Sequence, residues 1–282
     1  MYDKISGFSD EIDAAVDTQF GVLNKLHISY FEPRGIDGKN ISELSPNEVM
    51  KLKEKMNDYG IKASSIGSPI GKIKLEEPFE DHFELFKKVV ETARMLNVGY
   101  IRIFSFFHDG NEVWTREERA EVLARLRKMI DYAREKDVVL LHENEKDVYG
   151  DTIERCADLM KELYCDHFKA VFDPANFVQC GQDTKHAYEV LKDYIGYMHV
   201  KDACFTDGRV VPAGEGDGNV EYVLKQLLGH GYQGYISLEP HLGTFEGLAE
   251  LELDDKMLDL PKGGEGTYTL AYQALCEILE RI

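Results

Sequence analysis

Short runs of β-branched and aromatic residues alternate with longer segments of helical periodicity along the whole chain. Several of the short runs are almost continuously apolar, which is typical of parallel strands buried on both faces. The predicted strands are Ile5–Ser9, Tyr30–Pro33, Ile61–Ile66, Tyr100–Phe104, Val138–Glu143, Phe168–Asp173, Ile195–Lys201 and Gly234–Glu239. The predicted helices are Asp13–Leu26, Ser45–Tyr59, Phe79–Leu96, Thr115–Lys136, Thr152–Leu163, Asp183–Asp193, Val220–His230 and Thr267–Arg281.

Eight strand–helix units in 282 residues predict an α/β protein with a single (β/α)₈ TIM barrel domain over residues 1–282. The alternative is an open doubly wound sheet, but no Gly-x-Gly-x-x-Gly follows the first strand. Three long loops follow predicted strands, at Gly67–Pro78, Phe106–Trp114 and His241–Gly266. In a barrel they would surround the active-site mouth, where the last loop is either a lid or a tolerated insertion.

The charge of the chain limits its partners. Lysine and arginine total 33 against 52 aspartates and glutamates, so the net charge is −19. Such an acidic surface repels phosphate backbones and anionic lipids, which argues against nucleic-acid and membrane partners. The five cysteines form no C-x-x-C pair and no secretory signal is visible, so we expect a cytoplasmic location. A homo-oligomer is left open.

Four polar residues lie at the ends of four successive predicted strands, where each ends or interrupts an apolar run. They are Glu143, Asp173, His199 and Glu239. Taken singly, each has a structural explanation as a cap, an ion-pair partner or a hydrogen-bonded core histidine. Neighbouring barrel strands would bring all four together, and three carboxylates repel one another without a cation. The set therefore predicts a site for one divalent ion, with Mn²⁺ favoured and Mg²⁺, Co²⁺ or Zn²⁺ as alternatives.

Two basic residues and a glycine-rich loop are candidates for contacts with substrate oxygens or a phosphate. Lys201 has the same strand parity as His199, so it either binds substrate or pairs with Asp202 or Glu239. Arg209 is an anion contact or a solvated loop residue. The Gly214–Gly216 loop is a phosphate cradle or a plain turn.

Other polar residues on or near the strand ends are candidates for support of the site. Glu32, with Arg34 and Arg102, forms either a buried ion network or a contact with substrate. Glu145 shares the parity of Glu143 and is a candidate for orienting a ligand. His241 is a candidate hydrogen-bonding neighbour of Glu239 that could contact substrate.

Five local motifs stand out at the strand ends and in one loop. They are Leu-His-Glu-Asn-Glu, Phe-Asp-Pro-Ala-Asn, Met-His-Val-Lys-Asp, Gly-Glu-Gly and Ser-Leu-Glu-Pro-His, with an early Phe-Glu-Pro-Arg-Gly at residues 31–35. With these motifs the chain resembles the sugar phosphate isomerase/epimerase family of xylose-isomerase-like barrels, which includes ketose 3-epimerases, inosose dehydratases and endonuclease IV. The resemblance covers almost the whole chain.

The resemblance implies that the four strand-end residues hold a divalent metal. It also implies that Glu143 and Glu239 form an acid/base pair, as the matching glutamates do in ketose epimerases. The sequence departs from those enzymes at Asn176, where they carry a histidine. Asparagine can bind a substrate hydroxyl but cannot titrate usefully, so equivalence to a ketose 3-epimerase is in doubt.

These features favour an enzyme of carbohydrate metabolism, an isomerase or epimerase acting on a keto-sugar or its phosphate through an enediolate. A dehydratase of a keto-cyclitol is the main alternative, because the same first deprotonation can be followed by loss of a β-hydroxyl. A phosphodiesterase like endonuclease IV is disfavoured by the acidic surface and the few histidines. A non-catalytic sugar-binding barrel is the remaining alternative.

Overall fold

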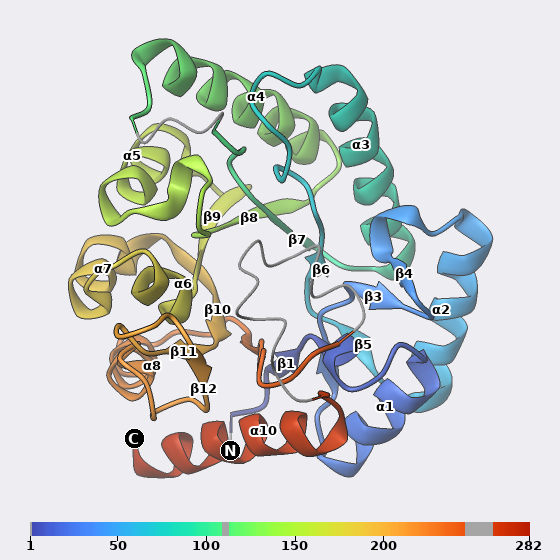
Figure 1. Ribbon diagram of the computed structural model, residues 1–282. Helices are drawn as coiled ribbons and strands as arrows, with labels where there is room; N and C mark the ends of the chain where they lie inside the picture. Colours follow the sequence, from blue (N-terminus) through green and yellow to red (C-terminus); the bar gives the residue numbers. More distant parts are fainter. Residues whose placement is uncertain (1, 109–112, 246–261) are drawn as a thin grey trace.

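The computed structural model describes residues 2–108, 113–245 and 262–282, and it arranges them as a ring of strands surrounded by helices (Figure 1). Most of the predicted lid or insertion at 241–266 falls on residues 246–261, which lie outside the described residues. The same holds for residues 109–112 of the predicted loop after the fourth strand.

Seven parallel strands form most of the ring, in the spatial order β1-β13-β10-β9-β8-β7-β6. Each lies at or within one residue of a predicted strand. Their bounds are β1 Ile5–Gly7, β6 Ile66–Gly67, β7 Tyr100–Ile103, β8 Val139–Glu143, β9 Phe168–Phe172, β10 Ile195–Val200 and β13 Ile236–Leu238.

Two short strands close the ring between β1 and β6. They are β2 (Tyr30–Phe31) and β5 (Lys62–Ala63), which pair in parallel with each other. The amide of Glu32 donates to the carbonyl of Gly7 at 2.8 Å, which joins this pair to β1. The predicted α/β barrel is thereby confirmed, and the open sheet is excluded.

Nine helices of the described residues surround the strands. Eight follow the predictions closely, and Pro174–Gln179 is additional. The bounds are α1 Val16–Lys25, α2 Pro46–Tyr59, α3 Phe79–Leu96, α4 Arg116–Glu135, α5 Ile153–Leu163, α6 Pro174–Gln179, α7 Thr184–Leu191, α8 Val220–Gly229 and α10 Glu265–Arg281. Short 3₁₀ turns lie at Ser9–Glu11, Ile41–Glu43, Tyr149–Asp151 and Lys192–Tyr194. Two small antiparallel pairs are β3 Gly35–Ile36 with β4 Lys39–Asn40 and β11 Asp202–Ala203 with β12 Val210–Val211.

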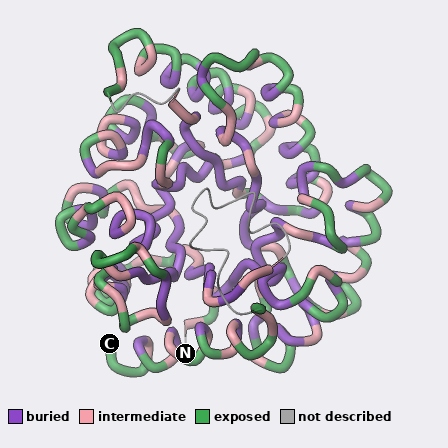
Figure 2. The backbone as a smooth tube through the Cα atoms, viewed as in Figure 1, coloured by how far each residue is buried: buried purple, intermediate pink, exposed green. Residues whose placement is uncertain are grey.

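Local chemistry explains where several helices begin. Ser45 and Thr115 each form a capping box with a glutamate three residues later, and the second box is the predicted one. The buried faces of the helices point inward onto the strands, and the exposed faces point outward (Figure 2). None of the helices within the described ranges is both long and apolar enough to span a membrane.

A buried histidine ties α3 to the loop that follows β6, and it makes stability depend on pH. His82 Nε2 accepts a hydrogen bond from the amide of Gly71 at 2.8 Å. Burial, together with the nearby charge of Arg125, lowers the pKa of His82 from 6.5 to about 4. Since the unfolded chain binds this proton more readily, the stabilising contribution is present above pH 6.5 and is lost as the pH falls toward 4.

Removing this group should flatten the acid side of the stability profile. We expect wild-type protein to lose about 2 kcal/mol more unfolding free energy between pH 7 and pH 5 than His82→Gln loses. Glutamine can still accept the Gly71 hydrogen bond but does not titrate. Urea unfolding at the two pH values measures the difference, and equal losses would show that folding does not lower the pKa of His82.

Candidate metal centre

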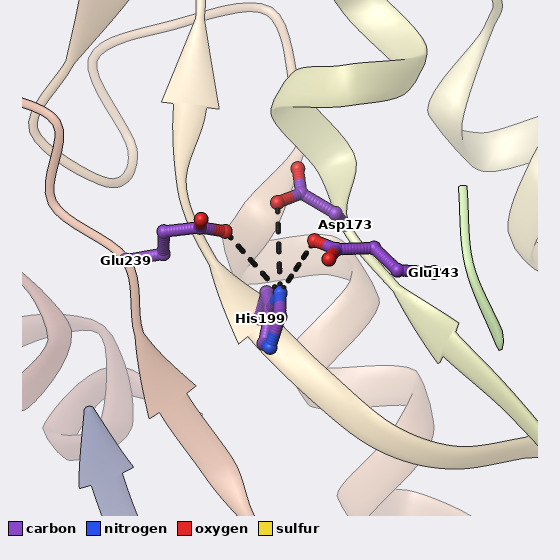
Figure 3. Close-up of side chains that lie close together, drawn as sticks. All are labelled: Glu143, Asp173, His199 and Glu239. Atoms are coloured by element: carbon purple, nitrogen blue, oxygen red, sulfur yellow. Dashed lines mark hydrogen bonds and ion pairs between the residues drawn. The ribbon is translucent and has the colours of Figure 1, made fainter. Parts of the chain in front are cut away.

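The four predicted ligands converge at the carboxyl ends of four adjacent strands (Figure 3). Glu143 ends β8, Asp173 follows β9, His199 lies in β10, and Glu239 follows β13. All four are buried, and each offers one ligand atom within 4.8 Å of the others. The sequence named these residues, and the structure brings all of them together.

The contacts inside the group centre on one imidazole nitrogen. His199 Nδ1 lies 2.7 Å from Glu143 Oε1, 3.2 Å from Glu239 Oε2 and 4.0 Å from Asp173 Oδ2. The oxygens of the two glutamates lie on either side of the Asp173 oxygen, and all three face this nitrogen (Figure 3). The group therefore brings three oxygens and one nitrogen together within the reach of a single ion.

The second ring nitrogen of His199, Nε2, contacts Glu32. Glu32 Oε2 lies 3.3 Å from His199 Nε2 and accepts hydrogen bonds from Tyr197 and Ser237. A carboxylate on the far nitrogen fixes the ring orientation and tautomer of a metal-binding histidine. Glu32 was predicted either to touch substrate or to belong to a buried network, and its described contacts place it behind the imidazole.

Asp173 divides its two oxygens between two tasks. Its Oδ1 accepts the amide of Asn176 at 2.9 Å, which caps α6. Its Oδ2 is buried and accepts no hydrogen bond from the described residues, although Lys201 Nζ lies 3.2 Å away as an ion pair. The cap therefore fixes the carboxylate so that its second oxygen faces the centre of the group.

Three buried cations surround the carboxylates. Arg102 donates to Glu143 at 2.6 Å, and Arg34 lies 3.4 Å from Glu239. Lys201 Nζ lies 3.2 Å from Glu239 Oε2, as it does from Asp173. Each carboxylate of the group thus has a positive partner, which offsets part of the cost of its burial.

The charges set the protonation of the carboxylates. Burial alone would raise the pKa of Glu143, but His199 and Arg102 outweigh it and lower the pKa to about 2. Burial raises the pKa of Asp173 to about 7 despite the nearby charge of Lys201. Asp173 is therefore the carboxylate that would gain most from a further positive charge.

The residues fit a single divalent cation. Three carboxylate oxygens and one imidazole nitrogen form a mixed hard and borderline donor set, and Asp173 Oδ2 is a buried acceptor without a donor. Four protein ligands leave coordination positions for substrate oxygens on a six-coordinate ion. Glu143, Asp173, His199 and Glu239 would hold the ion.

The residues predicted to bind substrate occupy different surroundings. Lys201 is buried at the metal ligands. The backbone amide of His241 donates to Glu11, and its Nε2 lies 3.4 Å from Glu239 Oε1. Asn176 is buried, and its amide Nδ2 donates to the carbonyl of Asn144. Arg209 lies apart from the group, with a 64 % exposed side chain 3.8 Å from Asp207.

Two acidic residues that the sequence analysis did not single out support the site from the 3₁₀ turn Ser9–Glu11, which follows β1. Asp10 accepts two hydrogen bonds from Arg34, at 2.8 and 3.1 Å, and Glu11 accepts a third at 3.2 Å. The guanidinium lies between the rings of Phe8 and Phe245. Asp10 and Glu11 have the same sequence signal as the four candidate ligands, because they are charged residues directly after a predicted apolar strand.

The glycine-rich loop is occupied by an internal anion. The carboxylate of Asp202 accepts the amides of Gly214, Gly216 and Gly218 at 2.8 to 3.1 Å, and that of Ala203 at 2.9 Å. A Cβ at Gly216 would lie 2.4 Å from Asp202 Oδ1, so only glycine allows this approach. These amides are therefore not available to a substrate phosphate.

The profile of the xylose isomerase-like TIM barrel family matches residues 21–256 of the chain. The protein belongs to this family. The match covers all four residues of the candidate metal centre, and it agrees with the resemblance found in the sequence motifs.

Proteins similar to this chain include enzymes of two reaction classes. An inosose dehydratase from Geobacillus thermodenitrificans is 22 % identical over 240 residues, covering 75 % of this chain and 80 % of the relative. The IOLI protein with a bound zinc atom has a TM-score of 0.76 at 16 % identity, covering 99 % of this chain and 98 % of that one. D-allulose 3-epimerase from Methylomonas sp. in complex with D-allulose has a TM-score of 0.73 at 16 % identity, covering 99 % and 97 %. At these identities the structural matches establish the fold.

Proposed function

We propose that this family member is a divalent-metal-dependent isomerase or epimerase of an unphosphorylated keto-sugar. The observation that carries the proposal is the placement of Glu143 and Glu239 on either side of Asp173 within one buried group (Figure 3). A substrate carbon held over the centre of the group would have a carboxylate on each side.

The two glutamates would move the proton. A divalent ion supplies, when bound, the positive charge that makes a hydrogen beside a carbonyl acidic and stabilises the enediolate. One glutamate removes the hydrogen and the other returns a proton to the opposite face, or to the neighbouring carbon. Arg102 and Arg34 keep their carboxylate partners charged and fixed in position.

Two observations favour a substrate without phosphate. The loop that could have cradled a phosphate binds the carboxylate of Asp202 instead. The three buried cations near the ligands are all paired with carboxylates, and Arg209 lies at the surface. An incoming phosphate would have to displace one of these internal anions.

Mn²⁺ is the ion we favour for this site. Carboxylates suit hard ions such as Mg²⁺ and Mn²⁺, whereas an imidazole ligand favours the softer members of the series. Mn²⁺ accepts both ligand types in a six-coordinate arrangement, and Zn²⁺ or Co²⁺ would suit the imidazole as well.

A dehydratase of a keto-cyclitol is the second candidate. The match to an inosose dehydratase over 75 % of the chain supports it. Its first step would use the same deprotonation, after which a hydroxyl on the next carbon leaves as water. Asn176, in place of the histidine of ketose epimerases, is compatible with either reaction.

Incubation in deuterium oxide with Mn²⁺ tests both candidates. D-allulose and 2-keto-myo-inositol are the substrates, with proton NMR and mass spectrometry as readouts. An isomerase exchanges the hydrogen beside the carbonyl and gives a product of unchanged elemental composition, whereas a dehydratase gives a product lighter by one water. Tight binding of either compound without exchange would contradict catalysis and favour a binding protein.

A further inference from the structure

A second pair of polar side chains lies at the same end of the barrel as the metal centre. Lys72 follows β6, and Glu145 lies two residues beyond the ligand Glu143. Lys72 Nζ lies 3.0 Å from Glu145 Oε2, and the side chains are 11 % and 18 % exposed. The pair joins the ends of strands on either side of β7.

The backbone under Lys72 is firmly held. The carbonyls of Ile70, Gly71 and Ile73 accept amides from the segment after β7 at 2.8 to 2.9 Å. Gly71 has a φ of +92°, and a Cβ there would lie 2.2 Å from the carbonyl oxygen of Phe104. Only glycine at position 71 therefore allows the Lys72 segment to pack this closely against the segment after β7. The amide of the same glycine donates to His82.

The backbone beside Glu145 is tied to the metal ligands. The side chain of Asn144 donates to the carbonyl of Asp173 at 2.9 Å and accepts its amide at 3.0 Å. Asn176 Nδ2 donates to the carbonyl of Asn144 at 2.8 Å. Glu145 thus follows a residue whose side chain is hydrogen-bonded to the backbone of Asp173. These bonds fix the position of Glu145 relative to the candidate ion site.

One aromatic ring links the pair to the metal centre. Lys72 Nζ lies 4.5 Å from the centre of the Phe104 ring. The guanidinium of Arg102, which binds Glu143, lies 4.5 Å from the centre of the same ring. The Phe104 ring therefore separates the Lys72–Glu145 pair from the Arg102–Glu143 pair. Lys72 and Glu145 are partly exposed to solvent, whereas Arg102 is buried.

We propose that Lys72 and Glu145 form a substrate subsite that binds two adjacent hydroxyls at the end of the sugar remote from the carbonyl. This proposal rests on the proposed function and names the part of the substrate that sets its specificity. The ammonium group donates to one hydroxyl oxygen, and the carboxylate accepts the proton of its neighbour. The two charges already balance each other, so the pair suits a neutral polyol better than an anion.

The subsite can be tested with a full substrate and a truncated one. D-allulose carries hydroxyls remote from its carbonyl, whereas dihydroxyacetone carries only the carbonyl and its two neighbouring hydroxyls. For Lys72→Met and Glu145→Gln, we expect KM for D-allulose in the Mn²⁺-supported exchange to rise about tenfold or more, with kcat changed less than about threefold. KM for dihydroxyacetone should change less than about twofold.

Two controls separate binding from structural support. Lys25→Met breaks an exposed ion pair of 2.9 Å between α1 and α10, and it should alter KM for neither compound. The double variant K72E/E145K restores an ion pair with its charges exchanged. It should recover the thermal stability of wild type but not its KM for D-allulose, because donor and acceptor have changed places.

Each outcome bears on a different claim. Wild-type protein that exchanges neither compound overturns the proposed function. Exchange by wild type, with unchanged KM in both single variants or with equal effects on both compounds, overturns the subsite. Recovery of KM by the charge-exchanged variant also overturns it, since the pair would then be structural support.

Discussion

Replacing Glu143 or Glu239 by glutamine should lower the rate of conversion of substrate to product by about 10²- to 10⁴-fold. Glutamine keeps the shape of the side chain but cannot take up a proton. The effect should be of similar size for the two variants, because conversion needs one group to remove a proton and the other to return one. Product formation measured by NMR at saturating Mn²⁺ gives the comparison.

The variants must be compared with bound ion present, since both residues also belong to the metal group. The manganese content of each variant is therefore measured alongside product formation. Glu154→Gln, on the exposed side of α5, is a matched control that should form product as wild type does. A variant at either position that keeps its manganese and forms product within about tenfold of the wild-type rate would contradict the acid/base assignment.

Mn²⁺ should stabilise the folded protein by about 4 kcal/mol at a free concentration a thousandfold above its dissociation constant. The unfolded chain does not assemble the four ligands, so the ion binds only the folded state. Asp173→Asn and His199→Gln should each lose most of this gain, because each removes one donor atom from the group. Urea unfolding with Mn²⁺ and with EDTA measures the difference.

Calcium provides a selectivity control for the same experiment. It prefers six to eight oxygen ligands, and the imidazole of His199 suits it poorly. The stabilisation by Ca²⁺ should therefore be smaller than that by Mn²⁺ at the same concentration. Equal stabilisation by both ions, unchanged in Asp173→Asn, would place the binding site elsewhere.

The strands could be predicted because parallel barrel strands are buried on both faces and read as apolar runs. The prediction Ile61–Ile66 was less exact, since that segment is divided into β5 and β6. Its first half pairs with β2 and its second half with β7, so the ladder changes partner near Ser64. A change of partner leaves no mark in the hydrophobic pattern.

Helix α6 had a signal that the periodicity did not reveal. Asp173 caps it and Pro174 is its first residue, a pair of residues typical of a helix start. The helix has only six residues, too few for a periodic apolar face to stand out. The same aspartate was recognised as a candidate ligand, and the cap explains how its orientation is fixed.

Glu239 was one of the expected partners of Lys201, but the partners of the buried arginines could not be predicted. Arg34 lies 205 positions from Glu239 in the sequence, and nothing in its surroundings indicates that contact. The glycine-rich loop is a similar case. The sequence shows Asp202 and the glycines, but it does not show that the glycine amides bind the Asp202 carboxylate. Which anion a cradle holds depends on the three-dimensional path of the chain.

The most direct test of the account is a crystal structure of the protein grown with Mn²⁺, with diffraction measured at the manganese absorption edge. The account predicts one strong anomalous peak per chain, within about 2.0 to 2.4 Å of an oxygen of Glu143, Asp173 and Glu239 and of Nδ1 of His199. The absence of a peak at this position, or a peak held by other residues, would contradict it.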